Sequence, residues 1–185
     1  MGASLDLALD STVVVVTGVM ASGKSTVAQA LAEHLPRSVH VRGDVFRRMI
    51  VSGREDLHPE ETPEAVAQLR LRHRLSATVA DLWAQAGWTA VVQDVILGEY
   101  LAEYVAAVRT RPLYVVVLAP RPEVVADREE RREKIGYSLW TVEDLDRSLR
   151  EDTPRIGLWL DNSDQTPEET VAAILADLPT ARISD

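Results

Sequence analysis

Residues 18–26 read GVMASGKST and follow directly on the apolar run STVVVVT. Gly18 to Ser25 match G-x-x-x-x-G-K-[ST], a pattern in which a glycine-rich loop wraps a phosphate group with its backbone N–H groups. Lys24 is one of two lysines among the 20 basic residues of the chain. A compact ammonium suits the outer phosphates of a nucleotide, whereas a planar guanidinium is wider and directs its donors differently. The pattern therefore predicts a nucleotide phosphate site.

We expect this loop to bind ATP together with Mg²⁺, with the Ser25 hydroxyl as a metal ligand. The helix that begins near Lys24 adds unpaired amides and the positive end of its dipole. The alternatives are an ordinary glycine-rich turn, or a dinucleotide-binding loop, for which Asp44 would be the distant acid; the G-x-G-x-x-G pattern of that loop is missing. The positions expected to contact the nucleotide here are Gly18, Ala21, Ser22, Gly23, Lys24, Ser25 and Thr26.

Two aspartates follow apolar, strand-like runs. Asp44 ends SVHVRGD and is expected to take the proton of an acceptor hydroxyl, as a general base. Its alternative role is the N-cap of a following helix. Asp94 ends AVVQD and is expected to hold Mg²⁺ directly or through water, the alternative being a loop cap. The two carboxylates thus predict separate acceptor and metal functions.

Arginines form the remaining candidate site. Arg128, Arg131 and Arg132 share one helical face, which is the layout of a lid over a nucleotide, and the alternative is a solvated helix with Glu–Arg pairs. Arg128 would pack on the adenine, and Arg131 or Arg132 would reach the transferred phosphoryl group. The catalytic set is therefore Lys24, Asp44, Arg128 and Arg132. The acceptor set is Asp44, Arg47, Arg48, Arg70 and Arg74, the last two alternatively belonging to a solvated helix face.

The elements that must position these residues alternate along the chain. Strands are predicted over 12–18, 38–44, 88–94, 113–119 and 156–162, and helices over 24–35, 64–87, 99–110, 121–133, 141–152 and 166–178. Thr141 and Thr166 are predicted N-caps, with Glu169 completing a capping box. In the long helix the core stripe is expected to be Leu71, Leu75, Val79, Leu82 and Ala86.

Alternating strands and helices with apolar strands predict an α/β fold: a three-layer, doubly wound, five-stranded parallel sheet with a small helical lid. Ligands then bind at the carboxyl ends of the strands, where the candidate residues lie. We expect a single P-loop kinase domain over 1–185, with an acceptor-binding helical region at about 45–87 and the lid at about 128–140.

The amino-acid composition limits the kinds of partner and metal site that are expected. The net charge of −9 argues against long nucleic acid, which needs a broad basic surface. The chain has no cysteine, hence no thiolate metal site. Its longest apolar runs are too short to span a bilayer, and its first residues lack the features of a signal peptide, so a cytoplasmic protein without membrane association is expected. Oligomeric state is left open.

Beyond these patterns, the chain resembles small-molecule kinases of the nucleoside-monophosphate-kinase fold, and the chloramphenicol phosphotransferase-like proteins most. The loop at 18–25, Asp44, VVQDVILGE and the R-x-x-x-R run carry the resemblance, which covers about 12–178. It implies ATP-dependent phosphorylation of a hydroxyl, with the base at Asp44. The polar loop after the last strand also resembles that group, and Asn162 in it is expected to contact the nucleotide. The sequence departs where Gln93 replaces the first of two expected acids.

The predicted function is phosphorylation of a small molecule, such as an antibiotic or a metabolite. Its alternatives are nucleotide hydrolysis without an acceptor, a nucleotide-sensing module that binds a protein partner, and a nucleic-acid end kinase or toxin-type kinase. The sequence does not identify the acceptor, nor does it distinguish ATP from GTP.

Overall fold

The computed structural model describes residues 9–131 and 140–184, which contain one five-stranded sheet. Its strands are β1 (Val13–Gly18), β2 (Ser38–Arg42), β3 (Thr89–Gln93), β4 (Leu113–Leu118) and β5 (Leu158–Leu160). They lie in the order β2-β3-β1-β4-β5, and all neighbours are parallel. This confirms the predicted fold class. Since β1 is central and its neighbours are β3 and β4, the loop after β1 opens at the point where the chain order reverses.

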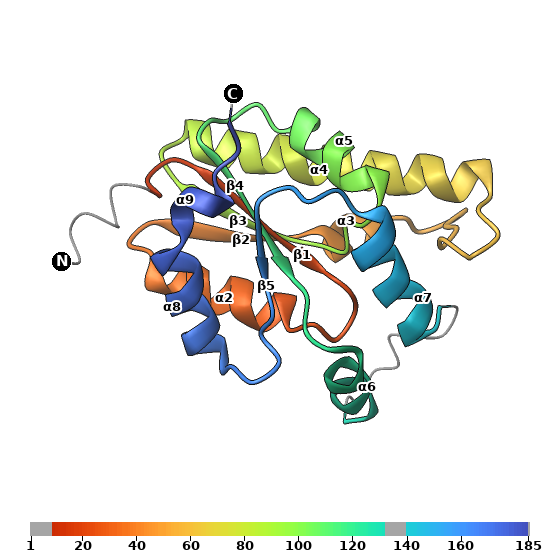
Figure 1. The fold of residues 1–185 in the computed structure, drawn as a ribbon. Helices are drawn as coiled ribbons and strands as arrows, with labels where there is room; N and C mark the ends of the chain where they lie inside the picture. Colours follow the sequence, from red (N-terminus) through yellow and green to blue (C-terminus); the bar gives the residue numbers. More distant parts are fainter. Residues whose placement is uncertain (1–8, 132–139, 185) are drawn as a thin grey trace.

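Helices cover both faces of the sheet (Figure 1). One face carries α2 (Lys24–His34) and α8 (Pro167–Ala176), and the other carries α4 (Pro63–Gln85) and α5 (Glu99–Ala107). The shorter helical elements are α3 (Gly43–Arg48), α6 (Pro122–Glu130), α7 (Val142–Arg147), the π-turn η1 (Ser148–Asp152) and α9 (Leu178–Ala181). The helices of the two outer layers thus support the sheet from both faces.

Two separate cores form because side chains of a strand alternate between the faces of the sheet. Val13 and Val15 of β1 pack under α4 and α5, while Val14 and Val16 pack under α2 and α8. All four are fully buried, and burying a valine side chain contributes on the order of 1.5–3 kcal/mol. The central strand is therefore a firm base for the loop that follows it.

Helix starts agree with the predicted caps. Thr141 and Thr166 each accept a hydrogen bond from a backbone N–H three residues on, and each completes a capping box, with Asp144 and Glu169. The predicted helix over 141–152 nevertheless stops at Arg147 and continues as the π-turn. The Thr153 hydroxyl donates to Ser148 O, five residues back, at 2.8 Å, which marks the wide turn.

The predicted core stripe of α4 is wrong for its three leucines and for the exposed Ala86, whereas Val79 is partly buried and packs against the core. Leu71, Leu75 and Leu82 are exposed, with 45%, 41% and 59% of their surface accessible. The buried side chains of α4 are mostly small and include Ala65, Ser76, Ala77, Ala80 and Ala84. Small side chains let the helix axis approach the sheet closely, so that this face forms the contact and the leucines face outward. The prediction chose the opposite face of the helix because it considered only the hydrophobicity of the side chains.

Strand β5 is shorter than predicted. It begins at Leu158 because Gly157 has φ +74°, and a Cβ there would lie 2.3 Å from Val115 O. α9 was not predicted.

Candidate active site at the carboxyl edge of the sheet

The loop between β1 and α2 is closely wound. Gly18 has φ +145°, and a Cβ there would lie 2.4 Å from Leu118 O and 2.8 Å from Ser22 Oγ. Gly23, the N-cap of α2, has φ +94°, and Ala21 has φ +60°. Glycine adopts such angles without steric penalty, whereas a side chain at position 18 would clash with the neighbouring strand. The two fixed glycines of the motif are thus required by the backbone path.

Polar groups converge on the inside of this loop. Lys24 is 6% exposed, and its Nζ donates to Val19 O at 2.5 Å. α2 has no acid in its first turn, so nothing there offsets its positive end. Ser22 Oγ is buried and has no hydrogen-bond partner within the described residues, whereas Ser25 and Thr26 are exposed. A buried hydroxyl without a partner among the described residues, beside the positive end of a helix, fits a bound anion.

Arg128 and Asn162 reach this loop from distant parts of the chain. Asn162 Nδ2 donates to Ser22 O at 3.1 Å, and Arg128 NH1 donates to the same oxygen at 3.4 Å. Arg128 NH2 donates to Asn162 O at 3.0 Å. Asn162 is 3% exposed, and in the part of the chain that is described its Oδ1 lacks a partner. Two residues predicted to contact the nucleotide therefore lie together at Ser22.

The loop after β5 is held in place by Arg121. Its guanidinium donates to both carboxylate oxygens of Asp164, at 2.9 and 2.8 Å, and these bonds lower the pKa of Asp164. The Arg121 backbone N–H donates to Ser163 Oγ at 2.8 Å. Hydrogen bonds from Ser163 lower the pKa of Asp161 in turn. These contacts fix the backbone on which Asn162 lies.

Asp94 is buried and paired with an arginine that the sequence did not single out. It is 3% exposed, and Arg72 donates Nε to its Oδ2 at 2.9 Å and NH2 to its Oδ1 at 2.5 Å. The Val95 backbone N–H also donates to Oδ1, at 2.8 Å. Arg72 borders the small-residue face of α4, so identifying that face first would have pointed to it. Asp94 is thus held rigidly at the end of β3.

Asp44 lies beside Asp94, in the first turn of α3. The preceding residue, Gly43, is packed so closely that a Cβ there would lie 1.9 Å from Asp94 Oδ2. The N-cap of α3 is Arg42, and Asp44 therefore does not cap this helix. The Asp44 side chain is half exposed and pairs with Arg48 at 2.9 Å. The two aspartates thus follow neighbouring strands at the same edge of the sheet, with Gly43 packed between them and the Asp44 side chain half exposed.

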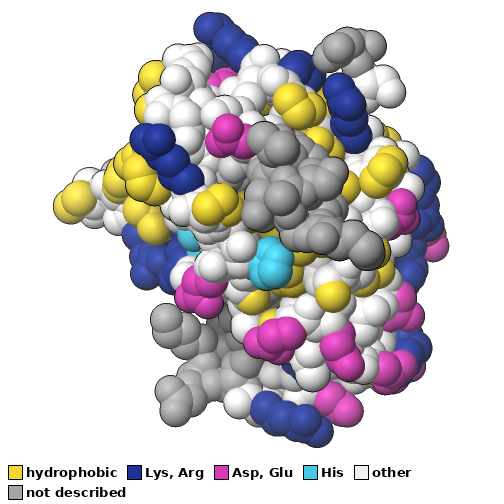
Figure 2. Space-filling view, turned by 90° about the vertical axis from the view of Figure 1, so that its left-hand side faces the viewer, with side chains coloured by type: hydrophobic (Ala, Val, Ile, Leu, Met, Phe, Trp, Pro, Cys, Tyr) yellow, Lys and Arg dark blue, Asp and Glu magenta, His cyan; other side chains and the backbone are white. Residues whose placement is uncertain are grey.

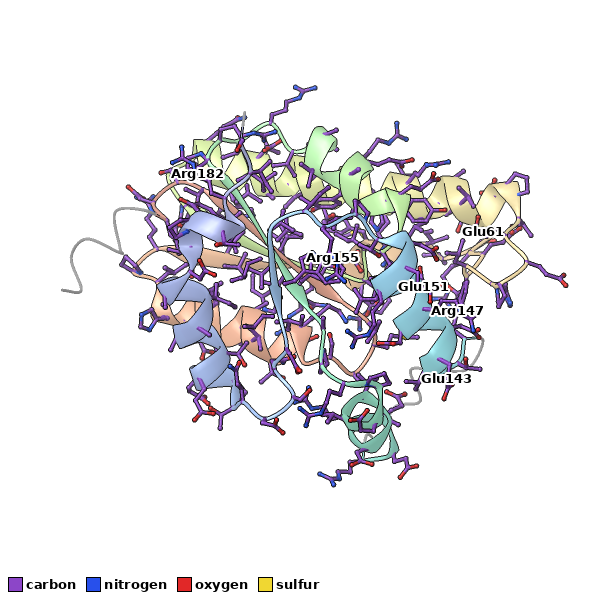
Figure 3. All side chains as sticks on the ribbon, in the orientation of Figure 1. Glu61, Glu143, Arg147, Glu151, Arg155 and Arg182 are labelled. Carbon is purple, nitrogen blue, oxygen red and sulfur yellow. The ribbon has the colours of Figure 1, made fainter. Side chains whose placement is uncertain are left out.

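Arg47 connects Asp44 to the loop over 51–62. It lies 3.8 Å from Asp44 and donates to both oxygens of Asp56, at 2.8 and 2.9 Å. These bonds raise the pKa of Arg47 and lower the pKa of Asp56. The Trp140 Nε1–H donates to Leu57 O at 2.9 Å, so the segment before α7 contacts the same loop. Figure 3 shows Glu61 of this loop on the same flank of the molecule as Glu143 and Arg147 of α7.

His73 lies in the buried layer beneath this end of the site. It is 5% exposed and packs edge-on against the rings of Tyr100 and Tyr104, 6.1 and 5.7 Å away between centroids. Its Nε2 has no hydrogen-bond partner among the described residues. Burial lowers the pKa of His73 to about 4, with opposing effects from nearby Asp94 and Arg72. The ring is therefore neutral at pH 7.

Arg70 and Arg74, both predicted to bind the acceptor, make their contacts elsewhere. Arg70 donates to both oxygens of Glu103, at 2.9 and 2.7 Å, and to Glu99 at 3.0 Å, which ties α4 to α5. Arg74 is exposed and lines a groove between α4 and α5, together with Thr78 and Asp81. Arg131 ends α6 on the surface. Arg132 and most of the predicted lid over 128–140 lie outside the described residues.

Charges of both signs are intermingled on the face shown in Figure 2, without a broad basic surface. Across residues 9–131 and 140–184 no cluster of three or more His, Asp or Glu side chains could hold a metal ion. A metal at Ser25 and Asp94 would therefore need ligands from the nucleotide phosphates and water. No described helix is long and apolar enough to cross a bilayer.

Comparison with known proteins agrees with this geometry. The sequence profile of the AAA domain family matches residues 13–151. A UPF0200 protein of Aeropyrum pernix is 39% identical over 137 residues, which cover 72% of this chain and 71% of the relative.

Several solved structures with the same fold are kinases. A sugar kinase from Janibacter sp. HTCC2649 superposes with a TM-score of 0.66 and 23% identity, covering 92% of this chain and 95% of the other. The APS kinase of Mycobacterium tuberculosis, solved with AMPPNP and APS, superposes with a TM-score of 0.64 and 22% identity over 89% and 95% of the two chains. With its phosphate-binding loop and parallel sheet, the chain belongs to the AAA domain family and has a P-loop kinase fold.

Proposed function

We propose that this protein transfers the γ-phosphoryl group of ATP to a hydroxyl of a small molecule, with Mg²⁺ as cofactor. The observation that carries the proposal is the juxtaposition at the carboxyl edge of the sheet. A phosphate cradle with a buried lysine follows β1, and at the same edge of the sheet Gly43 packs on Asp94 at the end of the neighbouring strand β3 and is followed by the half-exposed carboxylate of Asp44. A nucleotide sensor needs the cradle and has no use for the carboxylate.

The nucleotide half uses backbone groups and fixed side chains. Backbone N–H groups of the loop over 18–26 would bind the phosphates, although those of Ser22 and Thr26 now donate to Val19 O and Gly23 O. Lys24 would leave Val19 O for a phosphate oxygen. Ser22 Oγ and Asn162 Oδ1, both buried without partners among the described residues, would gain hydrogen bonds from bound ligand or its water. Arg128 would stack on the adenine, next to the loop that it already contacts.

The residues present also fit Mg²⁺. Ser25 has an exposed hydroxyl at the start of α2. Asp94 Oδ1 accepts from Arg72 and from the Val95 N–H, whereas Oδ2 accepts from Arg72 alone, so the second lone pair of Oδ2 suits a metal-bound water. When bound, the ion would neutralise charge on the β- and γ-phosphates.

The acceptor half supplies the base. Asp44 would take the proton of the acceptor hydroxyl. The hydroxyl oxygen of the acceptor would form a bond to the γ-phosphorus while the bond from that phosphorus to the ADP oxygen breaks. Arg47 and Arg48, which follow Asp44 in α3, would bind the acceptor. Lys24 and Arg132 would stabilise the charge on the transferred group, and Arg128 would contribute to catalysis by holding the nucleotide. The acceptor set also includes Arg70 and Arg74, whose present contacts are with α5 and its surroundings.

The resemblance to chloramphenicol phosphotransferase-like proteins and the sugar kinase and APS kinase neighbours support a small acceptor, such as an antibiotic or a metabolite. The test is a panel of such hydroxyl compounds with ATP and Mg²⁺, scored for ADP release above the rate without acceptor. A phosphorylated product from one class supports the proposal. ADP release that no acceptor increases would indicate hydrolysis, and nucleotide binding without turnover would indicate a sensor. Transfer to nucleic-acid ends or protein alone would indicate the other kinase classes.

A further inference from the structure

The outward face of α4 carries an apolar seam. Leu71, Leu75 and Leu82 are exposed, with Thr78 between them, and all four lie opposite the small side chains that face the sheet. Their spacing of four, three and four residues is that of the a and d positions of a two-stranded coiled coil. A helix face that was only solvated would not need leucine at this spacing, since monomers rarely expose aligned apolar residues.

We propose that α4 pairs with α4 of a second copy of this chain, as an antiparallel helix pair about a two-fold axis. Antiparallel pairing about a point between residues 76 and 77 places Leu71 opposite Leu82 of the second copy, and Leu75 opposite Thr78. Such layers of a against d positions close the seam over its whole length. Because the contact is isologous, one surface satisfies both copies, which is the commonest arrangement in soluble dimers.

The neighbouring surface complements the seam. A groove between α4 and α5 adjoins Thr78 and Leu82 and is lined by Arg74, Asp81, Gln85, Ala106, Ala107 and Arg109 as well. Under the two-fold operation, Leu71 of each copy lies against the end of the other copy's α4 that carries this groove. Ala102 and Ala106 of α5 are exposed beside it and are small enough to let a second helix approach.

The available area is that of a small specific interface. α4 has 23 residues and α5 has 9, which at 1.5 Å per residue give lengths of about 34 and about 14 Å. In Figure 1, α5 lies beside only part of α4. At about 10 Å per helix, the two helices together give a footprint of about 480 Å² per copy. Two copies would thus bury about 960 Å², close to the lower limit of about 1,000 Å² for a specific interface.

The first test is the oligomeric state. Light scattering coupled to size exclusion should give a dimer for the wild-type chain at micromolar concentration. In the double variant Leu75→Glu, Leu82→Glu, charges of the same sign enter both layers, and the dimer dissociation constant should rise at least about a hundredfold. Val51→Glu is the matched control, because Val51 is an exposed aliphatic residue away from the seam, and it should remain dimeric. Circular dichroism checks that the double variant stays folded.

Orientation is tested by cross-linking, which is simple because the chain has no cysteine. Mixed Leu71→Cys and Leu82→Cys proteins should oxidise to a covalent heterodimer, while each alone should cross-link poorly. A wild-type monomer at all concentrations, a dimer that the double variant leaves intact, or efficient cross-linking of either cysteine variant alone would each overturn the proposal. A larger complex formed only with another protein would overturn it as well.

Discussion

The two ends of the candidate site are built differently. At the nucleotide end, backbone groups and the buried Ser22 Oγ and Asn162 Oδ1 stand ready, and neither of these two atoms has a partner among the described residues. At the acceptor end, Asp56 is paired with Arg47 through bidentate bonds, and Asp94, at the proposed metal position beside it, is paired with Arg72 in the same way. At the nucleotide end, polar atoms are therefore available to a ligand. At the acceptor end, the charged side chains are already paired with one another. The nucleotide end suits a ligand whose phosphates are always the same. At the acceptor end, a bound acceptor must replace ion pairs between side chains with contacts of its own.

The difference between the two ends of the site is tested most strongly by Asp44→Asn. Asparagine keeps the shape of the side chain and cannot take a proton, so transfer to the acceptor found in the panel should fall by about 10²–10⁴. ATP affinity, from calorimetric titration, and the melting temperature should stay near wild type because Asp44 is half exposed. Glu61→Gln, another exposed carboxylate on this flank, is the control. Normal transfer would remove Asp44 as the base, and lost ATP·Mg²⁺ binding would assign it to the metal site.

Arg72→Gln tests whether the acceptor end is stabilised by its own ion pairs. It leaves Asp94 as a buried unpaired charge, which commonly costs about 3–5 kcal/mol of unfolding free energy. Arg74→Gln, two residues along the same helix and exposed, should cost less than about 0.5 kcal/mol. Urea unfolding measures both. Adding Asp94→Asn to Arg72→Gln should recover part of the loss, and equal effects of the two single variants would contradict the comparison.

Lys24→Ala addresses the nucleotide end. Loss of a charged donor at the phosphates should lower transfer by about 10²–10³ and weaken nucleotide binding. Lys24→Arg should also transfer poorly, since a planar guanidinium does not reproduce the ammonium geometry. Single-turnover transfer and nucleotide titration separate the two effects. Near-wild-type activity in Lys24→Ala would remove the phosphate assignment.

The smallest expected effect concerns His73 and acid. Its folded-state pKa of about 4 lies below the unfolded value of 6.5, so between these pH values the unfolded chain binds more protons. Stability that is present above pH 6.5 is therefore lost as the pH falls toward 4, by up to about 3 kcal/mol. His73→Leu should flatten this part of the profile, although His40, whose burial also lowers its pKa to about 4, still contributes. His34→Gln, at an exposed histidine, should leave the pH profile of stability unchanged. If His73→Leu also left the profile unchanged, His73 would not be a cause of the loss of stability in acid.

The sequence predicted the fold because its signals are local. The four valines of β1, the glycines at 18 and 23 and the threonine caps each favour one backbone conformation. The order of the elements then predicts a parallel sheet. The convergence of Asp44 and Asp94 followed from the rule that parallel strands end at the same edge. Arg128 and Asn162 were expected near the nucleotide, and the structure brings them to Ser22.

The rest required tertiary packing. Which face of α4 packs on the sheet depends on how closely the helix can approach the sheet. The face with small residues packs there, and the leucines are exposed. That choice decides which arginine of RLRHR points inward: Arg72 reaches Asp94, while Arg70 turns to α5. Periodicity carries no information about such competition between two plausible faces. The acceptor residues were therefore less predictable than those of the nucleotide end.

The hydrogen bond from Trp140 to Leu57 O also gives the molecule an internal optical probe. The indole is half-buried, and its environment depends on the loop that Arg47 and Asp56 hold together. Trp83, Trp88 and Trp159 lie elsewhere, at the end of α4, before β3 and in β5. A variant that keeps Trp140 as its single tryptophan would report, through the wavelength and intensity of its emission, when a compound disturbs the acceptor end.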